Sequence, residues 1–322
     1  MTQHSDIAVV AIGRNEGARL LECLTSLMGQ AAPVVYVDSG STDGSVAAAR
    51  ALGADVVELD MSQPFTAARA RNAGYERVRA LAPDGPYVQF LDGDCTLDAD
   101  WLATGKAALQ AGETVAVVCG RRREKFPEAT FWNRLTDDEW DGPAGEVRAC
   151  GGDALMRRRA VDAVQGYRED LIAGEEPEMC FRMRGQGWTI QRLDAEMTRH
   201  DAAMTRLSQW WQRCRRAGHT YAEGAAIHGR SPERYKVTEL RRTLFWALVL
   251  PALIVFGTWL VSPWALLGLL AYPAQILRLT RQGRPTAFAT CLVFGKFPEA
   301  QGVIGYWAGR ILGRRKTLIE YK

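Results

Sequence analysis

The sequence predicts an α/β fold with a parallel sheet flanked by helices, followed by a C-terminal helical region that associates with a membrane. Three observations lead to this prediction. Over the first 120 residues, short apolar runs alternate with helical patterns, which is typical of a parallel sheet with helices on both faces. Clusters of polar residues directly follow three of these runs. Near the C-terminus, a long stretch carries no charged residue.

The composition limits the class of protein. The chain has 322 residues, of which 47% are hydrophobic and 24% charged, as in an ordinary globular protein. A formal net charge of +3 is too small to indicate a nucleic-acid partner. The seven cysteines form no C-x-x-C pair, which favours reduced thiols in a cytosolic compartment over disulfides or a zinc site. The N-terminal apolar stretch is short and lacks a basic leader, so no signal peptide is expected.

The apolar runs place the expected elements along the chain. Strands are expected at residues 7–12, 34–37, 54–59, 87–91 and 115–119. Helices are expected at residues 20–28, 45–52 and 65–81. Beyond residue 120 the pattern is less regular. It indicates a helix at residues 160–164, a helix that follows Glu178 and ends at about residue 186, and a helix at residues 206–224. It also indicates a strand at residues 189–193.

Polar residues gather at the ends of three predicted strands. The first strand is followed by Asn15 and Glu16, the second ends at Asp38, and the fourth is followed by Asp92 and Asp94. In parallel sheets, ligands bind beyond the carboxyl ends of the strands, so these residues are expected to line one cleft. Asp38 can accept a hydrogen bond from a base or a ribose, although a capped turn explains it equally well.

Asp92-Gly93-Asp94 is a candidate site for a divalent cation. Two carboxylates suit Mg²⁺ or Mn²⁺, and Gly93 lets the backbone turn and a diphosphate approach. A polar turn with acids near a helix N-terminus explains the same residues, because D-x-D alone is a weak signal. His200 is a plausible third ligand, although a lone histidine is more often structural. Arg71 either faces a nucleotide or is a solvated helix residue.

Glu175-Glu176-Pro177-Glu178 contains the candidate general base. Proline favours the first helical turn and acids there complement the helix dipole, which accounts for Glu178. Glu175 and Glu176 are expected just outside the helix, where a carboxylate can point into a cleft.

The uncharged C-terminal stretch predicts a tight membrane hairpin. Residues 244–261 and 264–277 carry no charge, and a span requires at least about 17 residues. Arginines precede and follow the pair, which places both ends on the cytoplasmic side. The hairpin either spans the bilayer or is re-entrant. The alternative is a buried helical pair in a soluble protein. Trp210, Trp211 and neighbouring arginines indicate a helix at a membrane surface.

Seven motifs in order resemble the family 2, A-type glycosyltransferases. They are AIGRNE, VDSGSTDG, ARARNAG, FLDGD, GGDALMRRRAVDAVQGYRED, GEEPEMCFRM and a late histidine, over roughly residues 7–200. The resemblance implies a Rossmann-like GT-A fold with a mixed, mainly parallel sheet. It also implies site residues. The donor would contact Asn15, Glu16, Asp38, Arg71, Asp92 and Gly93, and the acceptor Gly151, Gly152 and Asp153. Asp94 and His200 would hold the metal. Glu175 and Glu176 form the acidic pair, with Glu176 as base, where Asp is usual.

The resemblance further implies inverting, metal-dependent transfer of a sugar from a nucleotide-sugar, expected to be a UDP-sugar, to an acceptor hydroxyl, with Mg²⁺ or Mn²⁺ as cofactor. The polymerising motif Q-x-x-R-W is incomplete here, which favours addition of one sugar. The expected acceptor is a lipid-linked saccharide in exopolysaccharide or envelope-glycan assembly, at the cytoplasmic face of the inner membrane. A nucleotidyltransferase and a non-catalytic, membrane-anchored nucleotide-sugar-binding subunit are the alternatives.

The expected domains are a transferase domain at residues 1–225 and a membrane region at residues 226–322. Within the first, residues 1–120 are expected to bind the donor and residues 121–225 the acceptor. Within the second, a hairpin at about residues 244–279 is followed by a basic amphipathic tail.

Overall fold

The chain forms two compact units in a computed structural model that describes residues 3–313. The first unit is Met1–Ala203 and the second is Met204–Lys322. The functional division expected at residue 225 stays a prediction. The part of the expected basic tail that follows Gly313 lies outside the described residues.

The first unit is built around a single mixed sheet. Within the described residues it has nine strands in the order β3-β2-β1-β4-β8-β6-β9-β5, with β7 paired to β9. The strands are β1 Ile7–Gly13, β2 Val34–Asp38, β3 Asp55–Glu58, β4 Tyr87–Asp92, β5 Cys95–Leu97, β6 Val115–Glu124, β7 Gly145–Val147, β8 Ala154–Arg157 and β9 Thr189–His200. Strands β1 to β4 are mutually parallel, and β8 runs antiparallel to β4 and β6. The predicted α/β class is confirmed.

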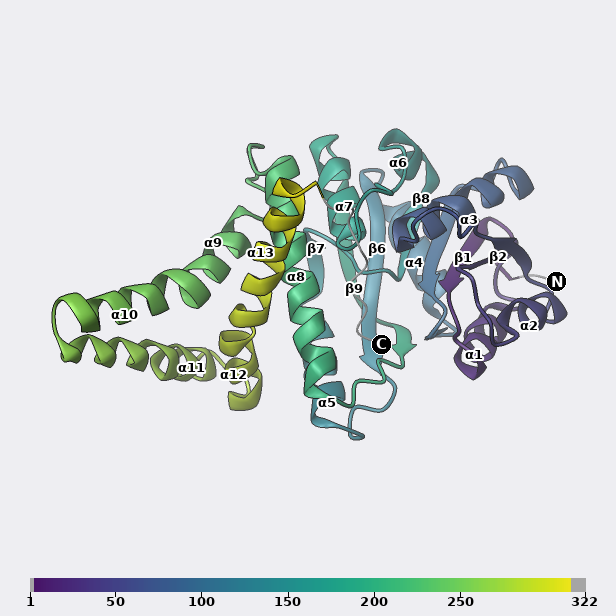
Figure 1. Cartoon of the computed structure of the whole chain (residues 1–322). Helices are drawn as coiled ribbons and strands as arrows, with labels where there is room; N and C mark the ends of the chain where they lie inside the picture. Colours follow the sequence, from purple (N-terminus) through teal and green to yellow (C-terminus); the bar gives the residue numbers. More distant parts are fainter. Residues whose placement is uncertain (1–2, 314–322) are drawn as a thin grey trace. The chain divides into compact units, whose positions relative to one another are not determined.

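Helices flank this sheet (Figure 1). They are α1 Ala18–Leu27, α2 Ser45–Ala51, α3 Ala67–Leu81, α4 Trp101–Ala111, α5 Phe131–Trp140, α6 Arg158–Ala163 and α7 Glu175–Gly185. Helix α3 begins where the Thr66 hydroxyl accepts a hydrogen bond from the Arg69 amide, 3.1 Å away. It lies close against β1 because residue 74 is glycine: a Cβ there would be 2.3 Å from Val10.

Two strands extend beyond their predicted ends. Strand β6 continues through Arg121, Arg122 and Arg123, a run of charge that resembles a loop in sequence. It remains a strand because it pairs with β9. Its side chains alternate as in any strand, so Arg122 pairs inward with the buried Asp153, whereas Arg123 pairs with Asp137. Strand β9 likewise runs on to His200, because it pairs with β6, β7 and β5 in turn.

The second unit is helical. Its helices are α8 Leu207–His228, α9 Val237–Leu244, the π-helix η1 Phe245–Val249, α10 Leu250–Leu260, the 3₁₀-helix η2 Pro263–Leu270, α11 Ala271–Arg281, α12 Thr286–Phe294 and α13 Lys296–Ile311. Helices α8 and α13 cross very closely, because a Cβ at Gly302 would lie 2.0 Å from the Arg215 carbonyl oxygen. The arm η1–α10 and the arm η2–α11 run side by side away from α8 and α13 (Figure 1).

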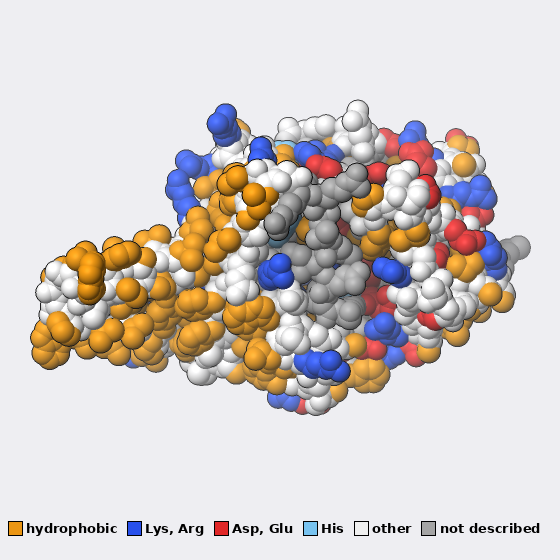
Figure 2. Space-filling view, in the orientation of Figure 1, with side chains coloured by type: hydrophobic (Ala, Val, Ile, Leu, Met, Phe, Trp, Pro, Cys, Tyr) orange, Lys and Arg blue, Asp and Glu red, His pale blue; other side chains and the backbone are white. Residues whose placement is uncertain are grey.

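The predicted hairpin is therefore present as a pair of helical arms, and apolar side chains cover it (Figure 2). Its first arm belongs to a helix, Val237–Leu260, that is long and apolar enough to cross a membrane. Only 17% of the most apolar window of that helix is buried. In the described part of the chain this helix is thus largely exposed, and its membrane location stays a prediction.

Candidate active site

The first two strand ends are tied together by side-chain hydrogen bonds. Asp38 is 3% exposed, and its carboxylate accepts hydrogen bonds from the Gly40 and Ser41 amides at 2.9 and 2.8 Å. The Tyr36 hydroxyl donates a third, at 3.0 Å. Asn15, with φ of 55°, accepts a hydrogen bond from the Thr42 amide at 2.7 Å. These contacts fix the loops after β1 and β2 at the same edge of the sheet.

Gly93 allows β4 to approach the end of β1. A Cβ at Gly93 would lie 3.0 Å from the Ile12 carbonyl oxygen and 3.4 Å from Cγ of Glu16. The Gly93 amide donates a hydrogen bond to that same carbonyl at 2.8 Å. Glu16 is held in turn by Arg19, 2.7 Å away. The predicted donor-binding residues Glu16 and Gly93 are therefore neighbours.

Arg71 connects three elements of the site. Its Nη1 lies 2.8 Å from Glu175, and its Nη2 lies 2.8 Å from Asp92 and 3.0 Å from Glu176. The residue is 2% exposed. Its guanidinium therefore forms ion pairs with these carboxylates and is not a solvated helix side chain. Strand β4, helix α3 and the start of α7 are thus joined by charge-assisted hydrogen bonds.

The acidic pair lies inside helix α7. The helix begins at Glu175, directly after Gly174, which has φ of 77°. The prediction that Glu175 and Glu176 precede the helix is therefore wrong. Gly174 adopts the left-handed conformation without strain, and Pro177 is tolerated because amides of the first turn have no helical partner. The Glu175 side chain is 4% exposed and that of Glu176 is 14% exposed, so Glu176 is the more accessible.

Burial and charge repulsion shift the acidity of this cluster. Burial, followed by repulsion from Glu175, raises the pKa of Glu176 to about 7. Asp92 behaves differently. Burial acts to raise its pKa, but Arg71 and Arg122 together hold the pKa of Asp92 below its usual value. At neutral pH, Glu176 can therefore accept a proton while Asp92 stays ionised.

Asp94 and His200 lie together, as predicted, although more than 100 residues separate them along the chain. Pairing of β5 with β9 sets Cys95 opposite His200, and His200 Nε2 lies 3.2 Å from Asp94 Oδ1. The side chains of Asp94 and His200 are 4% and 7% exposed. Asp94, Cys95 and His200 form a group whose possible ligand atoms all lie within 4.8 Å of one another. A carboxylate oxygen suits Mg²⁺ or Mn²⁺, and an imidazole nitrogen beside it favours the transition metal Mn²⁺ over Mg²⁺.

Residues from the second half of the sheet complete the site, and Asp153 organises them. Asp153 is 0% exposed. Its carboxylate accepts hydrogen bonds from the Thr198 hydroxyl at 2.8 Å and the Asp92 amide at 3.2 Å, and it pairs with Arg122 at 2.8 Å. The Asp153 carboxylate is therefore surrounded by protein groups. Its contact with an acceptor stays a prediction.

Arg122 and Trp140 were not among the predicted site residues. Arg122 Nη2 lies 4.0 Å from Asp92, and its guanidinium lies 5.4 Å from the centroid of the Trp140 ring. Trp140 also packs edge-to-face on His200, with ring centroids 4.7 Å apart. The run of three arginines was visible in sequence, but only strand alternation selects the middle one. Nothing in the sequence marks Trp140.

The two glycines before Asp153 lie against this network. A Cβ at Gly152 would lie 2.5 Å from Arg71 Nη2 and 2.8 Å from Asp92 Oδ2. A Cβ at Gly151 would lie 3.4 Å from Arg122 Nη2. The backbone of the predicted acceptor loop therefore passes directly over the ion pairs.

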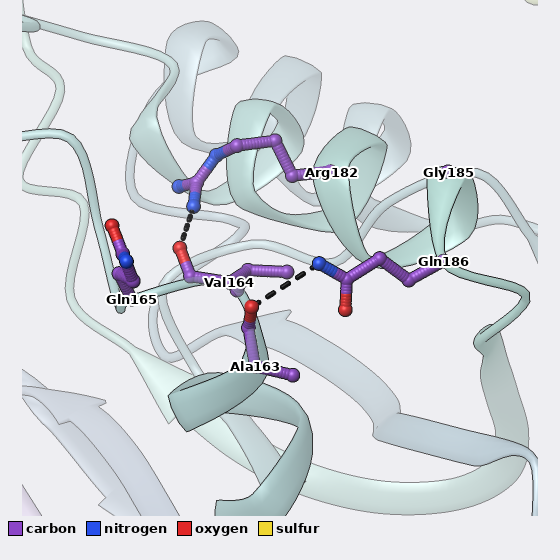
Figure 3. Close-up of a pocket in the computed structure, with 6 residues that line it drawn as sticks. All are labelled: Ala163, Val164, Gln165, Arg182, Gly185 and Gln186. Atoms are coloured by element: carbon purple, nitrogen blue, oxygen red, sulfur yellow. Dashed lines mark hydrogen bonds between the residues drawn. The ribbon is translucent and has the colours of Figure 1, made fainter.

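A shallow pocket elsewhere in the first unit includes none of these residues. It lies between the ends of α6 and α7 (Figure 3). There Arg182 donates to the Val164 carbonyl, and Gln186 donates to the Ala163 carbonyl at 3.1 Å. These bonds attach the end of α6 to α7. The pocket is a packing feature of the helix that carries Glu176.

Comparison with known proteins identifies the family to which much of the first unit is similar. Residues 8–164 match the family described as glycosyl transferase family 2. The chain carries a family 2 glycosyltransferase domain. The match covers the first two strand ends, Arg71, Asp92, Asp94, Arg122 and Asp153, whereas Glu175, Glu176 and His200 lie beyond it.

Curated relatives of this glycosyltransferase domain come from bacteria and an archaeon. The succinoglycan biosynthesis protein ExoA of Rhizobium meliloti is 29% identical over 175 residues, which are 51% of this chain and 52% of that protein. Glycosyltransferase AglE of Haloferax volcanii is 29% identical over 57% of this chain and 63% of its own length. Pre-mycofactocin glycosyltransferase of Mycobacterium tuberculosis is 29% identical over 64% of this chain and 45% of its own. The chain thus spans about half to two-thirds of these relatives.

Solved structures share the fold. The mannosyltransferase PcManGT of Pyrobaculum calidifontis, in complex with GDP-Man and Mn²⁺, aligns with a TM-score of 0.62 and 20% identity, over 93% of this chain and 87% of its own. TarS 1-349 of S. aureus, in complex with UDP, aligns with a TM-score of 0.50 and 15% identity, over 96% of this chain and 92% of its own. The predicted GT-A fold is confirmed.

Proposed function

We propose that this protein transfers one sugar from a nucleotide-sugar to an acceptor hydroxyl, with inversion and with a divalent metal as cofactor. The observation that carries the proposal is the position of Glu176. It lies 3.0 Å from Arg71, which also holds Asp92 at the end of β4, and it is the more accessible member of the acidic pair.

Glu176 is the proposed general base. A base is most effective when its pKa lies near the working pH, and the pKa of Glu176 is raised to about 7. It takes the proton from the acceptor hydroxyl as the oxygen attacks the anomeric carbon from the face opposite the nucleotide. The bond from that carbon to the diphosphate breaks, and the nucleoside diphosphate leaves. Arg71, which also pairs with Glu175, holds the base in position.

The proposed donor lies across the strand ends of residues 1–120. The loop after β2, which Asp38 orders, and the loop after β1, which Asn15 joins to it, accommodate the nucleoside. Gly93 gives the diphosphate close access to the backbone. Similar structures were solved with GDP-Man and with UDP, which supports a nucleotide-sugar in general. We expect a UDP-sugar.

Asp94 and His200 are the residues proposed to hold Mg²⁺ or Mn²⁺. The carboxylates of Asp92, Asp94, Asp153, Glu175 and Glu176 gather near the guanidinium groups of Arg71 and Arg122. Such an acidic site requires further positive charge before an anionic donor can bind. A bound divalent cation would neutralise charge on the departing diphosphate. The Mn²⁺ in the PcManGT complex is in keeping with this assignment.

The proposed acceptor is a lipid-linked saccharide at the cytoplasmic face of the inner membrane. Residues 121–225, with the glycine loop of Gly151 and Gly152, would form its side of the site. The exposed apolar hairpin and the arginines beside it support a membrane location. The name of the relative ExoA, a succinoglycan biosynthesis protein, supports exopolysaccharide or envelope-glycan assembly.

A donor panel tests the proposal. Detergent-solubilised full-length protein is incubated with Mn²⁺ and single nucleotide-sugars, and free nucleoside diphosphate is measured with and without a membrane lipid extract. We expect metal-dependent release from one donor, raised by the extract. Release of pyrophosphate from a nucleoside triphosphate and a sugar phosphate would instead identify a nucleotidyltransferase. Binding of a donor without release under all conditions would identify a non-catalytic subunit.

A further inference from the structure

The hairpin of the second unit, residues 243–277, presents apolar side chains along its whole length. Leu253, Phe256 and Leu267 are 62%, 58% and 56% exposed. Residues this apolar are rarely so exposed in water over a continuous surface. The space-filling view shows hydrophobic side chains over both arms on the face in view (Figure 2).

Close packing joins the two arms into one element. A Cβ at Gly268 would lie 2.8 Å from Ile254, and a Cβ at Gly257 would lie 3.1 Å from Ala265. Small residues at such contacts are typical of helix pairs in membranes. The Tyr272 hydroxyl donates a hydrogen bond to the Trp246 carbonyl at 2.8 Å, which satisfies a backbone group at the π-turn.

The two arms have matching lengths despite unequal numbers of residues. The first arm, residues 243–260, has 18 residues and rises about 27 Å at about 1.5 Å per residue. The second arm, residues 263–277, has 15 residues. Because η2 is a 3₁₀-helix, its residues rise about 2.0 Å each, and the arm reaches about 26 Å. Both lengths approach the hydrocarbon core of a bilayer, which is about 30 Å thick.

Aromatic and basic residues mark opposite ends of the hairpin. Trp259 and Trp264 flank the turn and are 79% and 77% exposed. Tryptophan prefers the interface between lipid and water and not the centre of the bilayer. At the other end, Arg241, Arg242 and Arg278 stand at the base of the arms. A re-entrant hairpin would place both tryptophans near the centre of the bilayer, whereas a spanning hairpin places them at the far interface.

The charge of the second unit orients the hairpin. Residues 204–313 contain 14 Lys or Arg and four Asp or Glu, although the whole chain is close to neutral. Positive charge beside apolar spans stays on the cytoplasmic side, where anionic lipid headgroups attract it. The uncharged turn at Ser262 and Pro263 is the end that can cross.

We infer that the hairpin crosses the entire bilayer and turns at the outer interface, with both ends on the cytoplasmic side. This inference rests on the membrane location in the proposed function and decides between the spanning and re-entrant forms. Its partner is an anionic lipid bilayer. Hydrocarbon chains surround the two arms, and anionic headgroups contact the arginines at the base of the hairpin.

Single cysteines test the topology in spheroplasts that express the full chain. Val261→Cys lies at the turn, where the side chain is 84% exposed, and Gln282→Cys lies at the base. Leu267→Cys, in the middle of the second arm, is the matched control. A membrane-impermeant maleimide is added before or after permeabilisation, and labelling above that of the wild type is measured. We expect Val261→Cys to react in intact spheroplasts, Gln282→Cys only after permeabilisation, and Leu267→Cys in neither case.

Other labelling patterns overturn the inference. Reaction of Val261→Cys only after permeabilisation would place the turn on the cytoplasmic side, and no reaction in either state would place it inside the bilayer. Reaction of Gln282→Cys in intact spheroplasts with reaction of Val261→Cys only after permeabilisation would reverse the orientation. Reaction of both cysteines in intact spheroplasts would place turn and base on the same, outer side, and the hairpin would then not cross the bilayer. Donor turnover in detergent is measured separately, so that failure of transfer with the expected labelling contradicts the proposed function alone.

Discussion

Nη2 of Arg71 lies 3.0 Å from the carboxylate of Glu176, and the same nitrogen lies 2.8 Å from Asp92. One guanidinium thus joins the proposed base to the strand end where the donor is expected. Because Arg71 is almost completely buried, it cannot turn away to solvent when substrates arrive. The position of the base is therefore tied to the position of the donor.

Glu176→Gln should reduce transfer by about 10² to 10⁴-fold, since the amide cannot accept the proton. Donor binding should remain, because Glu175 and Asp92 still pair with Arg71. Steady-state turnover and calorimetric titration with the nucleotide measure the two effects. Glu175→Gln is the matched control and should lose less turnover. Equal or greater loss in Glu175→Gln would assign the base to Glu175.

Transfer should increase with pH through about 7 and level off above it. The pKa of Glu176 is raised from its ordinary value to about 7, and only the ionised form acts as a base. The same shift affects stability: between the ordinary pKa and about 7, the folded protein holds a proton that the unfolded chain releases, so stability falls as pH rises. Turnover and melting temperature from pH 5 to 8 measure both trends. In Glu176→Gln the melting temperature should fall less as pH rises. The same fall as in the wild type would contradict the raised pKa of Glu176.

Asp94→Ala should abolish metal-dependent transfer and weaken Mn²⁺ binding at least about tenfold, because it removes the carboxylate that faces His200. His200→Gln should weaken binding as well. Electron paramagnetic resonance of free Mn²⁺ measures binding independently of turnover. The control is Asp100→Asn, an exposed acid at the start of α4. Wild-type Mn²⁺ affinity in Asp94→Ala would refute the metal assignment.

Gly152→Ala should reduce transfer strongly. Its Cβ would lie 2.5 Å from Arg71 Nη2, and the ion pairs must shift to make room. A displacement of about 1 Å in such a site can cost about 10²-fold in rate. Gly185→Ala is the control, because a Cβ there meets nothing within 4 Å. Comparable turnover in the two variants would show that the acceptor loop tolerates movement.

Gly302→Ala should destabilise the second unit by about 1–3 kcal/mol or more, since its Cβ would lie 2.0 Å from the Arg215 carbonyl oxygen and force α8 and α13 apart. Gly305→Ala in the same helix meets nothing within 4 Å and should stabilise by about 0.5–1 kcal/mol. Thermal melting in detergent, followed by circular dichroism, compares the two. Equal melting temperatures would contradict the close crossing.

The sequence was sufficient for the parts of the fold with regular patterns. The buried runs that became β1, β2 and β4 read directly as strands, because parallel strands covered on both faces are continuously apolar. Asp92 and Asp94 could be found for the same reason, since they follow such a run. The acidic pair was found as well, although its place inside α7 depended on the conformation of Gly174.

Other parts depended on pairing between distant segments. The charged half of β6 is a strand only because β9 lies beside it. Arg122 enters the site because it alternates with Arg121 and Arg123, and Trp140 enters because α5 ends next to His200. Neither contact follows from local spacing. Strand β8 has only four residues, too few for a periodic signal.

Strand β9 is the last strand of the sheet along the chain, and this has a consequence for the order of folding. It pairs with β5, β6 and β7, and it carries Thr198 and His200 to their partners. A chain still emerging from the ribosome lacks these partners until residue 200 has been made. Non-local pairings of this kind form late and slowly. The contact between Asp94 and His200 therefore cannot form before β9 has been made, and the proposed transferase site is completed only late in synthesis.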